Sequence, residues 1–259
     1  MFQKHSSRAA LLLALTSVPS AAFAQSAPAH PEEENSGQDP TRPVTRMDFR
    51  LKYQDNPGDS EAETLTFRTD KPFQLGGGWK LNTRLDIPVM RTEVPGNKTV
   101  GLTDILVQAL AIAPMKGKTT IAFGAQFHVP IGSEGFTSDT WRAAPTVAAI
   151  YQLPELSRGS FVGLLVRDDF SFAGNGPDTN VVSVEPIFNW QLPERWFITM
   201  SPEAKFNTKD NWNLFLPFDM TLGKKINPTT VVSLQGDVAL IDDYQQYDWQ
   251  LEFRVGLFF

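Results

Sequence analysis

The sequence contains no cysteine and only three histidines, His5, His30 and His128. Without cysteine there is no disulfide framework, no thiol nucleophile and no zinc–thiolate site. After residue 24 there is also no uninterrupted apolar run near 18 residues, so a helical membrane span is not expected. These absences exclude the disulfide-rich secreted domains, the cysteine-dependent enzymes and the helical membrane proteins.

A basic surplus is absent as well. The chain has 23 basic and 29 acidic residues, and loss of Lys4 and Arg8 with the N-terminal segment described next would leave 21 basic residues. Nucleic-acid binding needs a concentrated basic surface, so no nucleic-acid partner is expected. No cofactor or metal site is predicted either, because no cluster of histidine ligands occurs.

The N-terminus has the three regions of a secretory signal in their usual order. Lys4 and Arg8 give a basic start, an apolar stretch follows, and Ala22-Phe23-Ala24 is a small-x-small cleavage pattern. We therefore assign residues 1–24 to a signal peptide. Residues 25–45 are rich in Pro, Glu, Ser and Ala, which is typical of disorder, and they are interpreted as a disordered periplasmic leader.

From residue 46 to residue 259 the hydrophobic pattern has a period of two. The last segment is the clearest: Trp249, Leu251, Phe253, Val255, Leu257 and Phe259 alternate with a mostly polar set. Because only every second residue of a transmembrane β-strand faces lipid, a mean hydropathy of −0.22 is compatible with a membrane barrel. An apolar stripe that runs to Phe259 favours an outer-membrane β-barrel.

Similar segments recur along the chain, most of them near the ~9–11 residues that a tilted strand needs to cross a bilayer. The fold class is therefore all-β, a closed antiparallel transmembrane β-barrel of twelve strands, with ten or fourteen as alternatives. An even count places both termini in the periplasm. The outer loops lean acidic, whereas the inner turns at 116–118 and 224–227 carry paired lysines. The twelve predicted strands are 46–53, 62–69, 79–92, 102–115, 119–131, 141–153, 160–173, 180–191, 196–207, 212–223, 230–241 and 249–259.

All six tryptophans fall at ends of predicted strands. Aromatic side chains are expected at both membrane interfaces, where the ring is buried and the polar atom stays wet. A soluble β-sandwich or lipocalin-like barrel is the alternative, but it would bury its large aromatics in one core. The predicted membrane-rim aromatics are Trp79, Trp141, Trp190, Trp196, Trp212, Trp249 and Phe259.

The inward phase of the strands collects charges of both signs. These charges need partners or water, so two uses fit: they line a polar conduit, or they pair across the barrel and plug it. Twelve strands lie between barrels filled by side chains and wide channels, so strand number leaves both open. The predicted lumen-lining residues are Arg50, Lys52, Arg84, Asp86, Asp104, His128, Arg142, Arg167, Asp169, Glu185, Glu203, Lys205, Asp219, Asp237, Glu252 and Arg254.

An outer-membrane enzyme acting on lipid is the rival hypothesis. Such hydrolases use a histidine base beside a serine at the lipid-facing surface, and outside the predicted leader the chain offers only His128. His128 alternates out of phase with Phe127 and Val129, so it is expected inside the barrel. We predict no catalytic residue and no enzyme activity.

Several short stretches resemble one family of outer-membrane barrels, the "MetA-pathway of phenol degradation" or transporter-like family. The resemblance implies a barrel that passes small or hydrophobic compounds, and it supplies no functional residues. It covers most of the chain after residue 45. It rests on Gly78-Trp79-Lys80-Leu81 with Pro88, Trp141-Arg142-Ala143-Ala144-Pro145, Val184-Glu185-Pro186, the turn from Trp190 to Trp196, and Pro217 before Gly223-Lys224.

The sequence thus predicts a passive channel or transport-type protein of the bacterial outer membrane. A lipid-acting enzyme and a plugged structural or adhesive barrel are the alternatives. The expected partners are outer-membrane lipid, the barrel assembly machinery through the C-terminal strand, and a small-molecule solute.

Overall fold

A computed structural model describes residues 35–58, 60–94, 97–244 and 246–259. The predicted signal peptide and the first part of the predicted leader lie outside these residues. The described chain is almost entirely β-structure, with one short 3-10 turn at Pro193–Arg195. No helix among these residues is long and apolar enough to cross a bilayer. The strands are β1 (Arg46–Asn56), β2 (Ser60–Gly76), β3 (Trp79–Val94), β4 (Asn97–Leu102), β5 (Ile105–Ile112), β6 (Thr119–Val129), β7 (Thr140–Gln152), β8 (Phe161–Gly174), β9 (Asn180–Gln191), β10 (Trp196–Met200), β11 (Ala204–Asn207), β12 (Asn213–Asn227), β13 (Thr230–Asp242) and β14 (Trp249–Phe258).

These fourteen segments form twelve strands across the wall of one closed sheet, and we call each of these twelve a stave. β4 and β5 both pair with β3, one after the other, and β10 and β11 both lie between β9 and β12. Each of these pairs is one interrupted stave. Closure comes from antiparallel pairing of β1 with β14. The predicted twelve-stranded antiparallel barrel is confirmed, and each predicted strand corresponds to one stave.

The stave β10–β11 breaks where proline removes backbone donors. Pro202 lies between the two segments, and Pro186 and Pro217 lie in the neighbouring strands β9 and β12. Since proline has no N–H, it cannot donate to a ladder. The Ser201 N–H instead donates to Asp219 Oδ1, 2.9 Å away inside the barrel.

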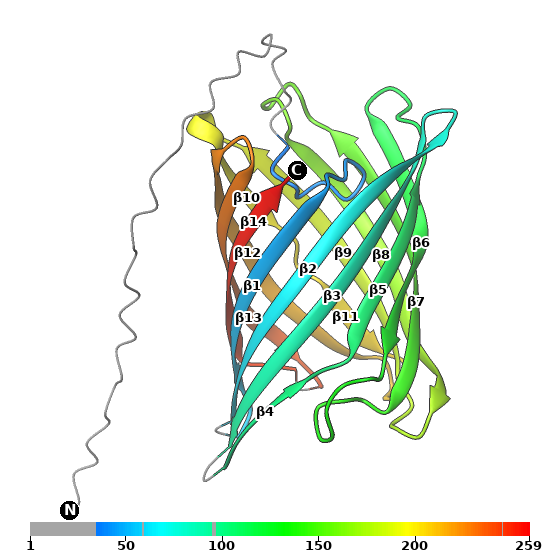
Figure 1. Ribbon diagram of the computed structural model, residues 1–259, viewed down its shortest axis with the longest axis vertical. Coiled ribbons are helices and arrows are strands. Elements are labelled where there is room, and N and C mark those ends of the chain that lie inside the picture. The colour runs from blue at the N-terminus through cyan, green and yellow to red at the C-terminus, as the bar shows by residue number, and fades with distance from the viewer. Residues whose placement is uncertain (1–34, 59, 95–96, 245) are drawn as a thin grey trace, which may run out of the picture. The chain divides into compact units, whose positions relative to one another are not determined.

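The start of β1 and the end of β14 lie at the same end of the barrel (Figure 1). The even number of strands across the wall assigns this end to the periplasm. Arg46 lies opposite Phe258, and Asp55 lies opposite Trp249 at the outer end. The C-terminal residue continues the pairing of β1 with β14, because the Phe259 N–H donates to the Thr45 carbonyl oxygen at 2.9 Å.

The outer face of the barrel is apolar. Every strand except β11 carries exposed large hydrophobic side chains, among them Leu51, Phe123 and Phe253, with 52, 48 and 48% of their surface exposed. An apolar band of this extent on a closed antiparallel barrel is the signature of contact with lipid. The protein is therefore an outer-membrane barrel.

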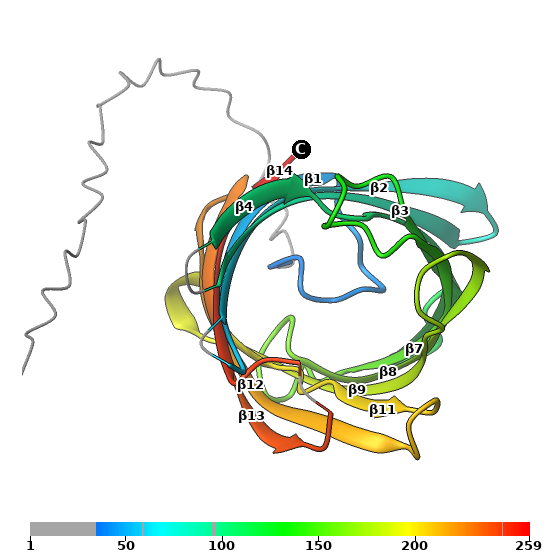
Figure 2. The same cartoon turned by 90° about the horizontal axis from the view of Figure 1, so that it is seen from below.

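Residues 35–45 correct one expectation. The sequence assigned them to a disordered periplasmic leader, but they form a loop inside the periplasmic half of the barrel (Figure 2). We call these residues the luminal segment. Gln191 Nε2 donates to Ser36 Oγ at 2.9 Å, Gln152 Nε2 donates to Asp39 Oδ2 at 2.7 Å, and Arg46 donates to the Gly37 carbonyl oxygen at 2.5 Å. The barrel wall provides the hydrogen-bond partners that the segment's composition alone does not reveal.

Burial has a chemical consequence in the luminal segment. Desolvation raises the pKa of Asp39 above its usual range, although hydrogen bonds from Thr41 and Gln152 act in the opposite direction. At the end of the segment, Val44 packs against a small apolar cluster of Phe197, Val231 and Phe258. The segment is thus held by polar contacts along its length and by one apolar anchor at its end.

A second loop enters the barrel from the outside. The connection between β6 and β7 folds inward, and Phe136 lies so close over Gly101 that a Cβ at this glycine would be 2.3 Å from the ring. The Ser138 N–H donates to Asp104 Oδ1 at 3.1 Å, which ties the loop to the residue between β4 and β5. The luminal segment therefore narrows the periplasmic end of the lumen, and the β6–β7 connection narrows the outer end.

Candidate functional site

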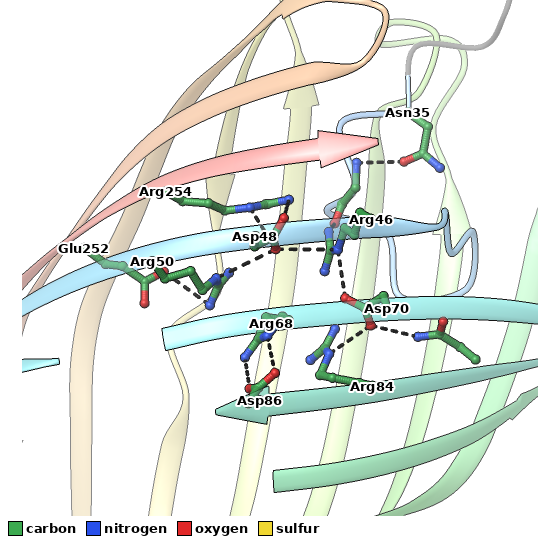
Figure 3. A network of polar contacts seen from close by, with 12 residues as sticks. Asn35, Arg46, Asp48, Arg50, Arg68, Asp70, Arg84, Asp86, Glu252 and Arg254 are labelled. Atoms are coloured by element: carbon green, nitrogen blue, oxygen red, sulfur yellow. Dashed lines mark hydrogen bonds and ion pairs between the residues drawn. The ribbon is translucent and has the colours of Figure 1, made fainter. Parts of the chain in front are cut away.

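One wall of the lumen is rich in arginine. Strands β14, β1, β2 and β3 are neighbours, and their inward positions carry Lys52 and the arginines labelled in Figure 3. The alternation places Arg46, Arg50 and Lys52 on the same face of β1, because residues two apart share a face. We call this surface the arginine wall: Arg46, Arg50, Lys52, Arg68, Arg84 and Arg254.

Aspartates placed between the arginines offset part of this charge. Asp48 is fully buried, and its Oδ2 lies 3.1 Å from Arg254 Nε and 3.6 Å from Arg46 Nε. Its Oδ1 also accepts a hydrogen bond from the Arg254 Nη2 at 3.2 Å. A buried carboxylate is tolerated only with such partners.

Asp70 and Asp86 play the same part on β2 and β3. Asp70 accepts hydrogen bonds from Arg46 at 2.8 Å, Arg84 at 3.0 Å and Asn82 at 3.2 Å. Asp86 and Arg68 form a two-pronged pair, with Nε to Oδ1 at 2.7 Å and Nη2 to Oδ2 at 2.5 Å. This parallel geometry is the strongest that an arginine and a carboxylate form.

Carboxylates are the main charged groups facing the lumen on strands β9 to β13. Glu185 lies on β9, Glu203 between β10 and β11, Asp219 on β12 and Asp237 on β13. Arg167 joins the first two, at 3.0 Å from Glu185 and 3.4 Å from Glu203, and Lys205 lies 3.4 Å from Glu203. Gln235 Nε2 bridges the other two, at 2.5 Å from Asp219 and 3.2 Å from Asp237.

The interior also has an apolar region, in the periplasmic half of β5–β9. Its strands β7, β8 and β9 lie across the lumen from the arginine wall, whereas β5 is paired with β3 (Figure 2). We call it the apolar wall. It is a cluster of buried side chains, namely Ile112, Ala122, Ala148, Ile150, Phe161, Leu165 and Ile187.

A third polar group lies toward the outer end. Arg142 donates to Asp169 Oδ2 at 2.6 Å, and His128 Nε2 lies 3.9 Å from the same oxygen. Asp104 accepts a hydrogen bond from the Ser138 hydroxyl of the inward-folded loop. His128 is thus placed inside the barrel, as its alternation predicted.

Two cavities occupy the lumen. One, of about 510 Å³, lies between the luminal segment, the arginine wall and the carboxylates of β9–β13. The other, of about 600 Å³, lies toward the outer loop and includes His128 and Arg142 in its lining. Both cavities share the side chains of Arg50, Lys52, Arg68 and Leu106, so the two spaces meet there.

The structure places fifteen of the sixteen predicted lumen residues in the lining of these cavities. The sixteenth, Asp169, does not line either cavity but forms an ion pair with Arg142, which does. Sequence reasoning missed Arg46, Asp48, Arg68 and Asp70. Arg46 and Asp48 lie in a predicted strand and share the alternation phase of Arg50, and Arg68 lies within the predicted strand 62–69, so their inward position could have been read from the sequence. Asp70 stayed hidden because the second strand was predicted to end at residue 69, whereas β2 continues to Gly76.

The predicted rim aromatics all lie at strand ends with at least a third of their surface exposed. Trp79, Trp190 and Trp196 lie at the periplasmic end, and Trp141, Trp212 and Trp249 lie at the outer end. Phe259 has 75% of its surface exposed. Within the described ranges, no group of three or more histidine and carboxylate side chains is arranged to hold a metal ion.

The fold defines an outer-membrane β-barrel with a charged lumen. Comparisons with solved structures agree on the fold. The outer membrane channel COG4313 from Pseudomonas putida F1 aligns with a TM-score of 0.71 at 13% identity, over 84% of this chain and 97% of that chain. The NanC porin aligns with a TM-score of 0.58 at 13% identity, over 82 and 98%. The KdgM porin aligns with a TM-score of 0.54 at 14% identity, over 83 and 99%.

The sequence comparison gives a family match over less than half of the chain. The family model described as "Putative MetA-pathway of phenol degradation" matches residues 52–169. This match confirms the family resemblance inferred from the short stretches of sequence. No curated protein matches the chain.

Proposed function

We propose that the protein is a passive outer-membrane channel for small solutes and that it favours organic anions. The observation that carries the proposal is the junction of the two cavities, where Arg50, Lys52 and Arg68 all face the lumen. Arg50 lies 3.2 Å from Glu252, and Arg68 is bound to Asp86. Lys52 has no carboxylate within 4 Å in the described part of the chain, so its charge is available to a solute.

Orphaned polar atoms support a wet lumen. Arg50 Nε, Arg142 Nε and Arg167 Nε are buried and have no hydrogen-bond partner within the described protein. Buried polar groups without a protein partner are normally hydrated. These atoms therefore favour a hydrated lumen over an interior filled by side chains.

Planar bilayers test the proposal directly. The reconstituted protein should give discrete conductance steps, and a KCl gradient should give a reversal potential of the sign for anion preference. Lys52→Gln should lower the anion-to-cation permeability ratio a few-fold, while Lys52→Arg should keep it. Absence of any conductance would refute the channel. Conductance without anion preference would refute only the solute class.

The luminal segment favours a second candidate, a plugged barrel. Its residues line the periplasmic cavity together with the arginine wall. Ser36 and Gln191 are in contact at 2.9 Å, and the chain has no native cysteine. Because the contact is made by the far end of the Gln191 side chain, a Ser36→Cys, Gln191→Cys pair should lock the segment when joined by a short thiol-reactive cross-linker with a reducible spacer. If the segment moves during transport, cross-linking should abolish the conductance and reduction of the spacer should restore it, while each single variant conducts throughout. If wild type never conducts and the locked form behaves identically, the plugged barrel is favoured.

We propose no enzymatic role. His128 lies inside the barrel beside Arg142 and Asp169, away from the face where a lipid substrate would lie. A lipid-hydrolysis assay of wild type against His128→Ala tests this: hydrolysis that depends on His128 would establish the enzyme.

We further propose that the C-terminal strand is the segment by which the assembly machinery recognises the protein. Its outward stripe runs from Trp249 to Leu257, and Phe259 follows with its side chain exposed at the periplasmic end. Deletion of Phe259 should impair insertion in cells while leaving conductance of the refolded protein intact. Normal assembly without Phe259 would contradict the proposal.

A further inference from the structure

The two rims of the barrel carry opposite charge. Exposed acids gather at the outer end, including Glu61, Glu63, Glu134, Asp178, Asp242 and Asp243. Basic residues gather at the periplasmic end, including Lys71, Lys116, Lys118, Arg158, Lys224 and Lys225. Among the described residues, Glu155 and Glu194 are the exposed acidic side chains of that rim. This asymmetry lies on the membrane-flanking surface, outside the lumen.

Three of the periplasmic lysines stand over aromatic side chains of the lipid-facing surface. Lys224 Nζ lies 4.7 Å from the centre of the Trp196 ring, Lys71 Nζ 5.4 Å from the Phe73 ring and Lys118 Nζ 5.9 Å from the Tyr151 ring. Each distance is within the ~6 Å range of a cation–π contact. We call these three lysines, with their rings, the basic collar.

The collar surrounds the barrel instead of marking one side. Its pairs lie on β2, on the β6–β7 end, and on the adjacent strands β10 and β12. The three aromatic side chains are exposed on the outer surface, with 42% of the surface exposed at Phe73, 43% at Tyr151 and 37% at Trp196. An aromatic ring at the bilayer edge with an ammonium above it places the charge at the level of the lipid headgroups.

The cations of the two rims also differ in their partners. At the outer rim, Arg91 lies 2.7 Å from Glu63, Lys98 lies 2.7 Å from Glu93 and Lys209 lies 3.6 Å from Asp178. In the collar, Lys118 pairs with Glu155 at 2.8 Å. Lys71 and Lys224 have no carboxylate within 4 Å among the described residues. The outer cations are neutralised by the protein, whereas two of the three collar lysines are open to an external anion.

From this arrangement we infer that the basic collar binds the phosphate groups of anionic phospholipids in the periplasmic leaflet. Lipid is favoured over a soluble anion because each ammonium lies above a ring that faces the bilayer. It is favoured over an anionic polymer of the periplasm because the three sites are distributed around the circumference. The inference does not depend on whether the barrel conducts.

Native mass spectrometry of the purified full chain in detergent tests the inference. The probes are phosphatidylglycerol, phosphatidylcholine and inorganic phosphate. The wild type should retain phosphatidylglycerol in preference to phosphatidylcholine, and millimolar phosphate should not displace it. A basic residue near an anionic surface contributes ~1 kcal/mol, so in the variant Lys71→Gln, Lys118→Gln, Lys224→Gln each of the three sites should bind phosphatidylglycerol about 5-fold more weakly.

Two matched triple variants control the experiment. Arg91→Gln, Lys98→Gln, Lys209→Gln removes three cations from the outer rim and should bind like wild type. Lys71→Arg, Lys118→Arg, Lys224→Arg keeps the collar charge and should also bind. Heat-modifiable gel migration verifies folding of each variant, and Lys224→Gln alone, with an expected loss of about 5-fold, replaces the triple if the triple does not fold.

Three results would overturn the inference. The first is undiminished phosphatidylglycerol binding by the folded glutamine triple, which would mean that the collar is not the site. The second is equal retention of phosphatidylcholine, which would mean that headgroup charge is not recognised. The third is displacement by inorganic phosphate, which would identify a soluble anion as the ligand.

Discussion

The arginine wall and the apolar wall face each other across one lumen but are stabilised by different forces. In the arginine wall, Asp48 and Asp70 are almost completely buried and each is surrounded by guanidinium groups. In the apolar wall, Ile150 and Phe161 have 1% of their surface exposed and pack as in a soluble core. A barrel can therefore close part of its interior by packing while it keeps the remainder charged and hydrated.

The luminal segment contacts the arginine wall on one side and, on the other, polar residues of β7 and β9, two strands that also carry residues of the apolar wall. It accepts a hydrogen bond from Arg46 on one side and hydrogen bonds from Gln152 and Gln191 on the other. The difference between the walls predicts that changes of charge destabilise one side and changes of volume the other.

The largest effect is expected from Asp70→Asn. The substitution preserves shape but leaves Arg46 and Arg84 without the charge that offsets theirs. Removing one partner of a buried ion pair costs about 3–5 kcal/mol. Denaturant titration of the folded barrel in detergent should show this loss of unfolding free energy. The control is Glu63→Gln, because Glu63 pairs with Arg91 at the exposed outer rim and should change stability by about 1 kcal/mol or less. Equal effects of the two variants would contradict the ranking.

A smaller effect is expected from Ile150→Val in the apolar wall. Removal of one buried methyl group should cost about 0.5–1.5 kcal/mol through lost packing. Ile121→Val is the matched control, since Ile121 has 47% of its surface exposed on the outer face. The same titration in detergent compares the two. A cost at Ile121 as large as that at Ile150 would mean that the apolar wall is not packed as a core.

The smallest effect concerns pH. Because burial raises the pKa of Asp39, the docked luminal segment binds a proton more tightly than a released segment does. The contribution to docking is complete below the ordinary pKa of 3.8 and is lost as pH rises through the higher pKa of the docked state. A spin label on Gln38→Cys should therefore be more mobile at neutral than at acidic pH. Asp39→Asn should remove this pH dependence. A label mobility that does not change with pH in the protein that retains Asp39 would contradict the prediction.

Much of the barrel could be predicted because alternation is local. A strand alternates its side chains between two faces whatever its neighbours are, so the inward placement of Glu252 and Arg254 and the outward placement of Trp249 can be read from one segment. The same reasoning placed His128 inside. It missed Arg46, Asp48 and Arg68 although they lie within predicted strands. It failed at Asp70 because strand ends are set by pairing with neighbouring strands, and the second strand was predicted to stop at residue 69.

The amino-acid sequence by itself determined the period of two, a best count of twelve strands with ten or fourteen as alternatives, the charge lean of the loops at each rim and the inward face of most lumen charges. These properties follow from backbone geometry and residue order along single segments. Only the tertiary structure decided which charges meet, that Asp70 serves both Arg46 and Arg84, and that residues 35–45 lie in the lumen. Partner choice depends on strand register and barrel closure, which join residues such as Asp48 and Arg254, 206 positions apart. A flexible, polar stretch such as the luminal segment becomes ordered only where a closed wall supplies its hydrogen bonds.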